Sequence, residues 1–132
     1  MCLIAFALHA DPALPLLIAA NRDEFFDRRT AALHRWRLGD GTEVVGGRDL
    51  REGGTWLGLS PKGRVAMLTN VRQPVVSAFP RSRGELVTRW LQSDGDVERF
   101  ADGIAPDDYG GFNLVVGDFH TRAWHWLGNR DP

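Results

Sequence analysis

Cys2 is the residue of this chain best suited to chemistry, because it is the only cysteine and directly follows the initiator Met1. A small residue at position 2 usually allows the initiator methionine to be removed, which would give Cys2 a free α-amine beside its thiol. A terminal α-amine titrates at about 7.7 to 8.0 and an ordinary thiol at about 8.5, so near neutral pH the amine can accept the thiol proton. Cys2 is therefore a candidate nucleophile with its own base, although a lone cysteine near a terminus is more often a packing residue.

The segments that follow Cys2 predict a hairpin that brings polar groups close to it. Residues 2–9 and 16–20 are apolar runs typical of strands buried on both faces, and Asp11-Pro12 with Pro15 predicts a turn between them. In an antiparallel hairpin the end of one strand lies beside the start of the other. We therefore expect the polar run 21–24 to lie within reach of Cys2.

Glycine-rich turns separate short strands in the middle of the chain. Residues 43–45 predict a strand and 46–49 a turn, while 56–59 and 64–69 predict a hairpin around the Pro61-Lys62-Gly63 turn, with Asn70 at its end. The residues between the glycines are β-branched or aromatic, which favours tight β turns over a flexible linker.

Two helices and a last hairpin complete the predicted elements. Ser82 and Glu85 have the spacing of a capping box, and apolar residues then repeat at helical spacing until Gly95. A second short helix is predicted over 97–104, and a hairpin over 112–127. Strands, then helices, then strands indicate an α+β fold with a largely antiparallel sheet in one domain, 1–132. Strands apolar on both faces need cover on both sides, so a layered sandwich with helices outside is expected.

Composition excludes several classes of protein. The 132 residues carry 16 basic and 17 acidic side chains without a long run of one sign, so no nucleic-acid partner is expected. One cysteine cannot form an internal disulfide, no secretory signal is evident, and the first apolar run is too short to span a membrane. These features predict a cytoplasmic protein without an integral membrane segment, in which a free thiol would persist.

A series of motifs in sequence order resembles the NRDE family. They extend over nearly the whole chain, so the resemblance is specific. The motifs are Met1-Cys2-Leu3, Ala19-Ala20-Asn21-Arg22-Asp23-Glu24-Phe25, Gly46-Gly47-Arg48-Asp49-Leu50, Gly53-Gly54-Thr55-Trp56-Leu57-Gly58, Leu68-Thr69-Asn70-Val71-Arg72, Ser82-Arg83-Gly84 and Gly111-Phe112-Asn113-Leu114.

The family in turn resembles the N-terminal nucleophile hydrolases of the penicillin V acylase and bile salt hydrolase type. That resemblance implies a four-layer αββα sandwich and cleavage of non-peptide linear amides. By motif, Cys2 would be the nucleophile and base, Asp23 would orient its amine, and Asn70 would donate to the oxyanion. An oriented amide donor of this kind can stabilise a transition state by about 3 kcal/mol.

The chain departs from the acylase pattern in two places. The acylases carry an Arg where this chain has Ala20, and the nearest arginine is Arg22, which a continuing strand would point to the same side. Family members are also generally longer, so we expect either a fragment or a short member with an incomplete sandwich. Exposed apolar sheet would then favour a homo-oligomer or a missing partner segment.

Four further residues are candidates for substrate binding: Asn21, Arg48, Trp56 and Asn113. Each has a structural alternative. Arg48 could form an ion pair with Asp49 that fixes the glycine turns, Trp56 could serve a hairpin crossing, and Asn113 could satisfy buried backbone. No metal site is expected, because only His120 and His125 come near a ligand spacing.

Two functions of different classes remain. The first is an amidohydrolase that needs no cofactor and acts on a small or lipophilic linear amide. The second is a noncatalytic carrier of haem or another lipophilic ligand, because an animal member of the family is linked to haem and lipid handling. In that case Cys2 or one of the histidines would be the axial ligand; the histidines are His9, His34, His120 and His125.

Overall fold

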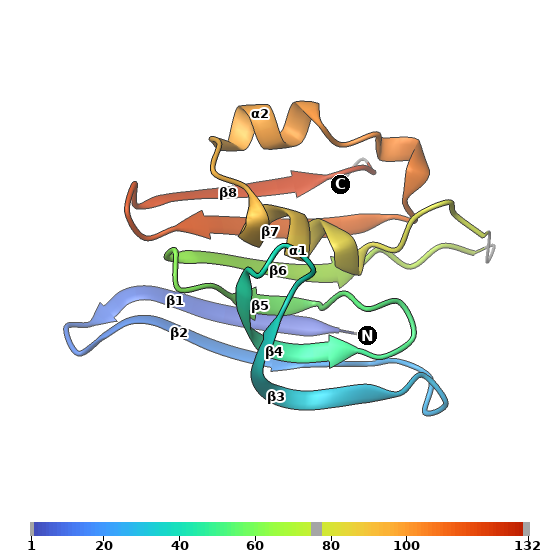
Figure 1. Cartoon of the computed structure of the whole chain (residues 1–132), viewed down its shortest axis with the longest axis horizontal. Coiled ribbons are helices and arrows are strands. Elements are labelled where there is room, and N and C mark those ends of the chain that lie inside the picture. Colours follow the sequence, from blue (N-terminus) through green and yellow to red (C-terminus); the bar gives the residue numbers. More distant parts are fainter. Residues whose placement is uncertain (1, 75–77, 131–132) are drawn as a thin grey trace.

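The computed structural model describes residues 2–74 and 78–130 and contains two antiparallel sheets and few helices (Figure 1). The elements in chain order are β1 (Leu3–Asp11), β2 (Leu14–Asn21), β3 (Thr30–Arg37), β4 (Glu43–Asp49), β5 (Leu57–Leu59), β6 (Arg64–Asn70), α1 (Gly84–Gln92), α2 (Val97–Asp102), the 3₁₀ turn η1 (Pro106–Asp108), β7 (Phe112–Asp118) and β8 (Ala123–Gly128).

Each described strand pairs with a strand that directly precedes or follows it in the chain, but β2 and β3 do not pair with each other. β1 and β2 form a separate two-stranded sheet, and β3 to β8 form a six-stranded sheet in sequence order. All pairs are antiparallel. The predicted α+β class and the three predicted hairpins are therefore confirmed.

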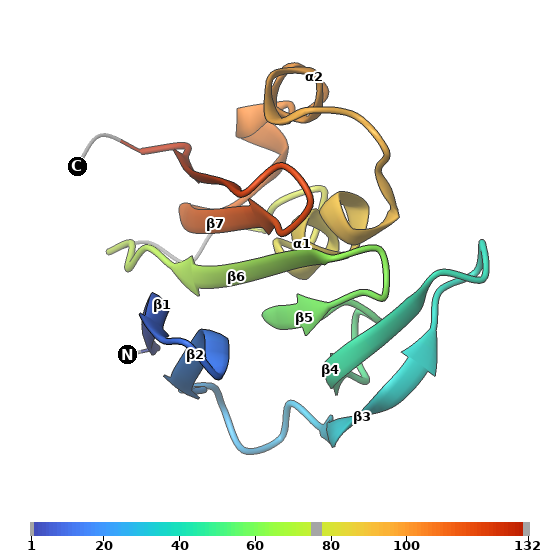
Figure 2. The same cartoon turned by 90° about the vertical axis from the view of Figure 1, so that its left-hand side faces the viewer.

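The described residues are stacked in three layers (Figure 2). The helices lie on one side of the six-stranded sheet, and the β1–β2 hairpin lies on the other side of β6. Phe6 of β1 stacks on Trp124 of β8, with ring centroids 6.0 Å apart, which ties the hairpin to the larger sheet. A second outer layer of helices, as a four-layer sandwich requires, is not among the described residues.

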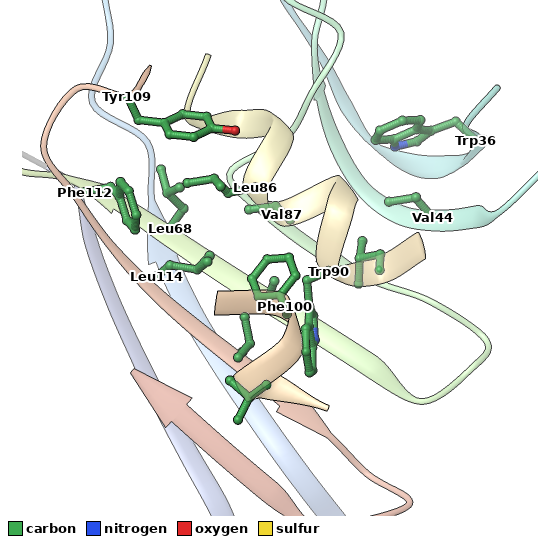
Figure 3. Close-up of a cluster of buried hydrophobic side chains, with 14 residues drawn as sticks. Trp36, Val44, Leu68, Leu86, Val87, Trp90, Phe100, Tyr109, Phe112 and Leu114 are labelled. Atoms are coloured by element: carbon green, nitrogen blue, oxygen red, sulfur yellow. The ribbon is translucent and has the colours of Figure 1, made fainter. Parts of the chain in front are cut away.

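The main core lies between α1 and the six-stranded sheet (Figure 3). Helical spacing places Leu86, Val87, Trp90 and Leu91 on one face of α1, and all four side chains are buried. They pack with Leu68 and other buried residues of β6 and β7. Burial of each large apolar side chain contributes about 2 kcal/mol, so this face holds α1 against the sheet.

The prediction that both strands of the first hairpin are buried on both faces is wrong. Phe6 belongs to the face that meets the larger sheet, whereas Leu3 and Leu17 belong to the opposite face and are 68% and 57% exposed. No described element covers that outer face. The strand buried on both sides is instead β6, in which Val65 to Leu68 are all buried between α1 and the hairpin.

The predicted turn at 46–49 is also wrong, because these residues continue β4. A Cβ on Gly46 would lie 2.4 Å from the carbonyl oxygen of Leu57, and one on Gly47 would lie 2.6 Å from the Trp56 ring. The two glycines therefore allow close packing within the sheet and make no turn. β3, which was not predicted, pairs with this strand.

Both predicted helices are present, but the capping box is not formed. Arg83 holds the N-cap position of α1 with helical backbone angles and without a side-chain cap hydrogen bond. The Glu85 carboxylate instead accepts a 2.5 Å hydrogen bond from the Tyr109 hydroxyl and pairs with Arg81 at 2.7 Å. α2 does have a side-chain cap, in which Asp96 accepts from the backbone N–H of Arg99.

Candidate functional site

A cavity of about 400 Å³ lies where the first hairpin meets the six-stranded sheet and the start of α1. We call it the Cys2 cavity, since Cys2 is part of its wall. Its wall comes from the end of β2, the β4–β5 connection, the end of β6 and the segment before α1. Among its lining residues are four arginines, Arg22, Arg28, Arg81 and Arg83, and four carboxylates, Asp23, Glu24, Asp49 and Glu52.

The backbone of Asp23 holds the thiol of Cys2. The N–H of Asp23 donates to Sγ at 3.3 Å, and the thiol donates to the carbonyl oxygen of Asp23 at 3.6 Å. Antiparallel pairing produces this contact, because Leu3 of β1 lies opposite Asn21 of β2. The expected proximity of residues 21–24 to Cys2 is thus confirmed. Cys2 itself is partly buried.

Arg22, Trp56 and Asn70 also line the cavity. The guanidinium carbon of Arg22 lies 4.9 Å from the centroid of the Trp56 ring, a cation–π arrangement that holds the side chain against the wall. Asn70 is the last residue of β6, as predicted; it is exposed and lines the cavity. A thiol, a guanidinium and a side-chain amide from three separate segments of the chain therefore share one cavity.

A buried ion pair forms another part of the wall. Arg28 donates to Oδ2 of Asp49 through Nε at 3.0 Å and Nη2 at 2.6 Å, and it lies 3.8 Å from Glu24. Burial by itself would raise the pKa of Asp49, but the hydrogen bonds from Arg28 and the Arg51 N–H outweigh it and leave this pKa below its ordinary value. The hydrogen bond to Asp49 correspondingly raises the pKa of Arg28.

Arg83 extends over the cavity from the start of α1. Its Nη1 donates to the carbonyl oxygen of Gly111 at 2.9 Å. Burial lowers the pKa of Arg83, and the negative charge of Glu24 acts in the opposite direction. Arg83 is therefore a partly buried cation that lines the same cavity as Cys2.

Three of the predicted substrate-binding residues do not line the cavity. Asn21 accepts a hydrogen bond from the Leu3 N–H at 2.8 Å, inside the hairpin. Arg48 lies 4.5 Å from the centroid of the Trp36 ring and donates to the carbonyl oxygen of Gly53. Asn113 accepts from the indole N–H of Trp126. The predicted Arg48–Asp49 ion pair is wrong, because Arg28 pairs with Asp49.

None of the four histidines lines the Cys2 cavity. His9 lies near the end of β1, His34 lies in β3, His120 lies in the turn after β7, and His125 lies in β8. Of the candidates for an axial haem ligand, only Cys2 belongs to the cavity.

Comparison with known proteins assigns the family. All residues from 1 to 132 match the family described as Transport and Golgi organisation 2. The chain belongs to this family. The NRDE-family resemblance predicted from the motifs is therefore confirmed.

Family members from animals align with almost the whole chain. The Transport and Golgi organization protein 2 homolog of Bos taurus is 42% identical over 98% of this chain, and that of Homo sapiens is 40% identical over the same share. The Transport and Golgi organization protein 2 of Drosophila melanogaster is 45% identical over 87% of it. The alignments cover 51%, 51% and 45% of these relatives, so the chain spans about half the length of the curated relatives it matches.

Two further observations complete the description of the site. Within the described ranges, no helix is both long enough and apolar enough to cross a membrane.

The sequence predicts no role for Arg28 or Arg83, and it suggests Asp49 only as a partner of Arg48. Asp49 and Arg83 lie inside the motifs that carried the family resemblance, and that signal could have marked them.

Proposed function

We propose that Cys2, freed of Met1, is the nucleophile of an amidohydrolase that cleaves non-peptide linear amides, and that the chain has the N-terminal nucleophile hydrolase type of fold. The observation that supports this most is the Cys2 cavity itself, in which the thiol is held by Asp23 and faces a space also lined by Asn70. A thiol buried as core filler would not line a cavity with eight charged side chains.

The first half of the reaction forms a thioester. The α-amine of Cys2 takes the thiol proton, and the sulfur attacks the acyl carbon of the amide. The side-chain amide of Asn70 donates to the developing oxyanion, and Arg22 adds positive charge within the same cavity. The C–N bond then breaks, and the leaving amine takes the proton held by the α-amine.

The second half of the reaction releases the acid. Water gives a proton to the α-amine and attacks the thioester, and the thiol leaves with that proton. The net change is one amide and one water converted into one carboxylic acid and one amine. In this scheme Asp23 orients the α-amine and Trp56 forms an apolar wall for the substrate.

The test is hydrolysis of a panel of linear amides by the purified chain and its variants. Cys2→Ala should abolish turnover, and Asn70→Ala should lower kcat by about 10² to 10³ fold, because one oxyanion donor is lost. Asn113→Ala is the matched control, since Asn113 contacts Trp126 outside the cavity and its loss should leave kcat unchanged. Turnover that persists in Cys2→Ala would contradict the proposal.

Haem or lipophilic-ligand binding stays a prediction that no specific feature of the cavity favours. The histidines lie outside the cavity, and its walls carry four arginines and four carboxylates. The spectroscopic check is simple. A Soret shift on addition of haemin that disappears in Cys2→Ala would support this alternative, and an unchanged spectrum would count against it.

A further inference from the structure

The cavity wall contains arginines that differ in how their charge is compensated. Arg28 lies within 4 Å of Asp49 and Glu24, and Arg81 lies 2.7 Å from Glu85. Among the described residues, no carboxylate lies within 4 Å of the guanidinium of Arg22 or Arg83. Arg22 is held by the Trp56 ring instead.

Arg83 is a partly buried cation. Among the described residues, its side chain makes one hydrogen bond, from Nη1 to the carbonyl oxygen of Gly111. A guanidinium presents five N–H donors in a planar fork, so most of the donor capacity of Arg83 is left for water or a ligand. Burial lowers the pKa of Arg83, which agrees with a cation that lacks full compensation for lost water.

Arg83 occupies a position that favours the binding of an anion. It lies at the start of α1, where the positive end of the helix dipole also favours an anion, and Ser82 and Gly84 on either side line the same cavity. Arg83 and Cys2 line the same cavity of about 400 Å³, which places both groups within the reach of one small molecule. An anionic group bound at Arg83 would therefore belong to a molecule whose other end is at the thiol.

The rest of the cavity limits the size and character of that molecule. Its volume of about 400 Å³ is in the range that accommodates a small organic ligand. Trp56, Leu68, Val71 and Phe79 provide apolar wall beside the charged groups. A small molecule with one anionic group and one apolar group suits these surroundings.

We infer that the substrates are linear amides bearing a carboxylate, of the N-acyl amino acid class, and that Arg83 binds this carboxylate with its guanidinium fork while the amide carbon lies at Cys2. This inference rests on the proposed amidohydrolase function and adds the substrate class to it. Charge-assisted, two-pronged hydrogen bonds from arginine to a carboxylate are among the stronger polar contacts in proteins, so they can select acids over neutral analogues.

The test measures binding without turnover. A panel of N-acyl amino acids and their matched primary carboxamides is titrated by calorimetry into the Cys2→Ser variant, which keeps a small polar residue at the site but removes the thiol. We expect each acid that binds to bind about tenfold or more tightly than its carboxamide. Introducing Arg83→Gln into the Cys2→Ser variant should remove this preference for the acid. Introducing Arg83→Lys should retain only part of the preference, because lysine keeps the positive charge but lacks the planar guanidinium with its paired donors.

Arg35→Gln is the matched control, because Arg35 lies on β3 with its side chain 78% exposed and outside the cavity. The acid preference should survive this change. Thermal unfolding of each variant verifies that it is folded. A panel in which no acid binds more tightly than its carboxamide, or a preference that persists in folded Arg83→Gln protein, would overturn the inference.

The same panel separates this inference from the proposed function. Acid-selective binding to Cys2→Ser without hydrolysis by the unmodified chain would support the Arg83 site and contradict the amidohydrolase. Hydrolysis that does not distinguish acids from carboxamides, with no acid preference in binding, would support the amidohydrolase and overturn the Arg83 site.

Discussion

Asp49 makes the stability of the cavity wall depend on pH. Its pKa in the folded chain lies below the ordinary value of 3.8, because the favourable hydrogen bonds from Arg28 and the Arg51 N–H exceed the effect of burial. A carboxyl group with a lowered folded pKa binds more protons in the unfolded chain. Its contribution to stability is therefore present above pH 4 and is lost as the pH falls through the folded pKa.

Asp49→Asn should lower the free energy of unfolding at pH 7 by about 2 kcal/mol, since Arg28 loses a charged partner. The difference from the unmodified chain should be constant above pH 5 and should shrink as the pH falls below 4. Urea unfolding at a series of pH values measures both trends. A difference that grows in acid would contradict the assigned role of Asp49.

Residue-level predictions succeeded where covalent geometry and pairing decide the outcome. The contact of Cys2 with Asp23 follows from the hairpin, since antiparallel pairing determines which ends meet. The partner of Asp49 could not be predicted in the same way. Arg48 is its neighbour in sequence, but alternation along β4 directs adjacent side chains to opposite faces, and Arg28 comes from the loop after β2.

At the scale of elements, two glycines set the distance between the β4–β5 connection and α1. A Cβ on Gly54 would lie 2.6 Å from the carbonyl carbon of Gly84, at the first residue of the helix. The atoms that this Cβ would meet belong to the backbone, so no flexible side chain could move aside to make room for it. The close approach of these two backbones positions the start of α1, and with it Arg83, in the cavity wall.

Gly54→Ala should lower the free energy of unfolding by about 2 kcal/mol, because the start of α1 must shift away from the sheet. Gly39→Ala is the matched control, because no atom lies within 4 Å of a Cβ added at Gly39. The free energy of unfolding of this variant should be nearly unchanged. Chemical denaturation compares the two variants. Equal stability of both would show that the contact at Gly84 does not constrain the helix.

The same scale shows where sequence patterns mislead. Helical spacing identified α1 and α2 correctly, because each has an apolar face that must be buried. The capping box failed because Glu85 has stronger partners in Arg81 and Tyr109. Glycine density at 46–49 was interpreted as a turn, although these glycines serve close packing in a sheet, a requirement visible only after folding.

At the scale of the whole molecule, the outer face of the β1–β2 hairpin is apolar and uncovered by described residues. It presents Leu3 and Leu17, and both edges of this two-stranded sheet are unpaired within the described chain. Exposed apolar sheet is expected to favour a homo-oligomer, and this stays a prediction. Its test is the dependence of molecular mass in solution on protein concentration.

Sedimentation should show association of the chain as its concentration rises, and Leu17→Glu should weaken that association by placing charge on the outer face. Leu50→Glu is the control, since Leu50 is similarly exposed, at 53%, and lies outside the hairpin. A monomer at every concentration, or equal effects of the two substitutions, would exclude this face as a contact between copies.

The central claim concerns one terminus, so the most direct measurement is the intact mass of the purified chain. If Cys2 is a nucleophile whose base is its own α-amine, the mass must be lower than that of the full sequence by one methionine residue. We predict that mass, together with rapid alkylation at Cys2 near neutral pH. A chain that retains Met1 has no free amine on Cys2 and would contradict the account.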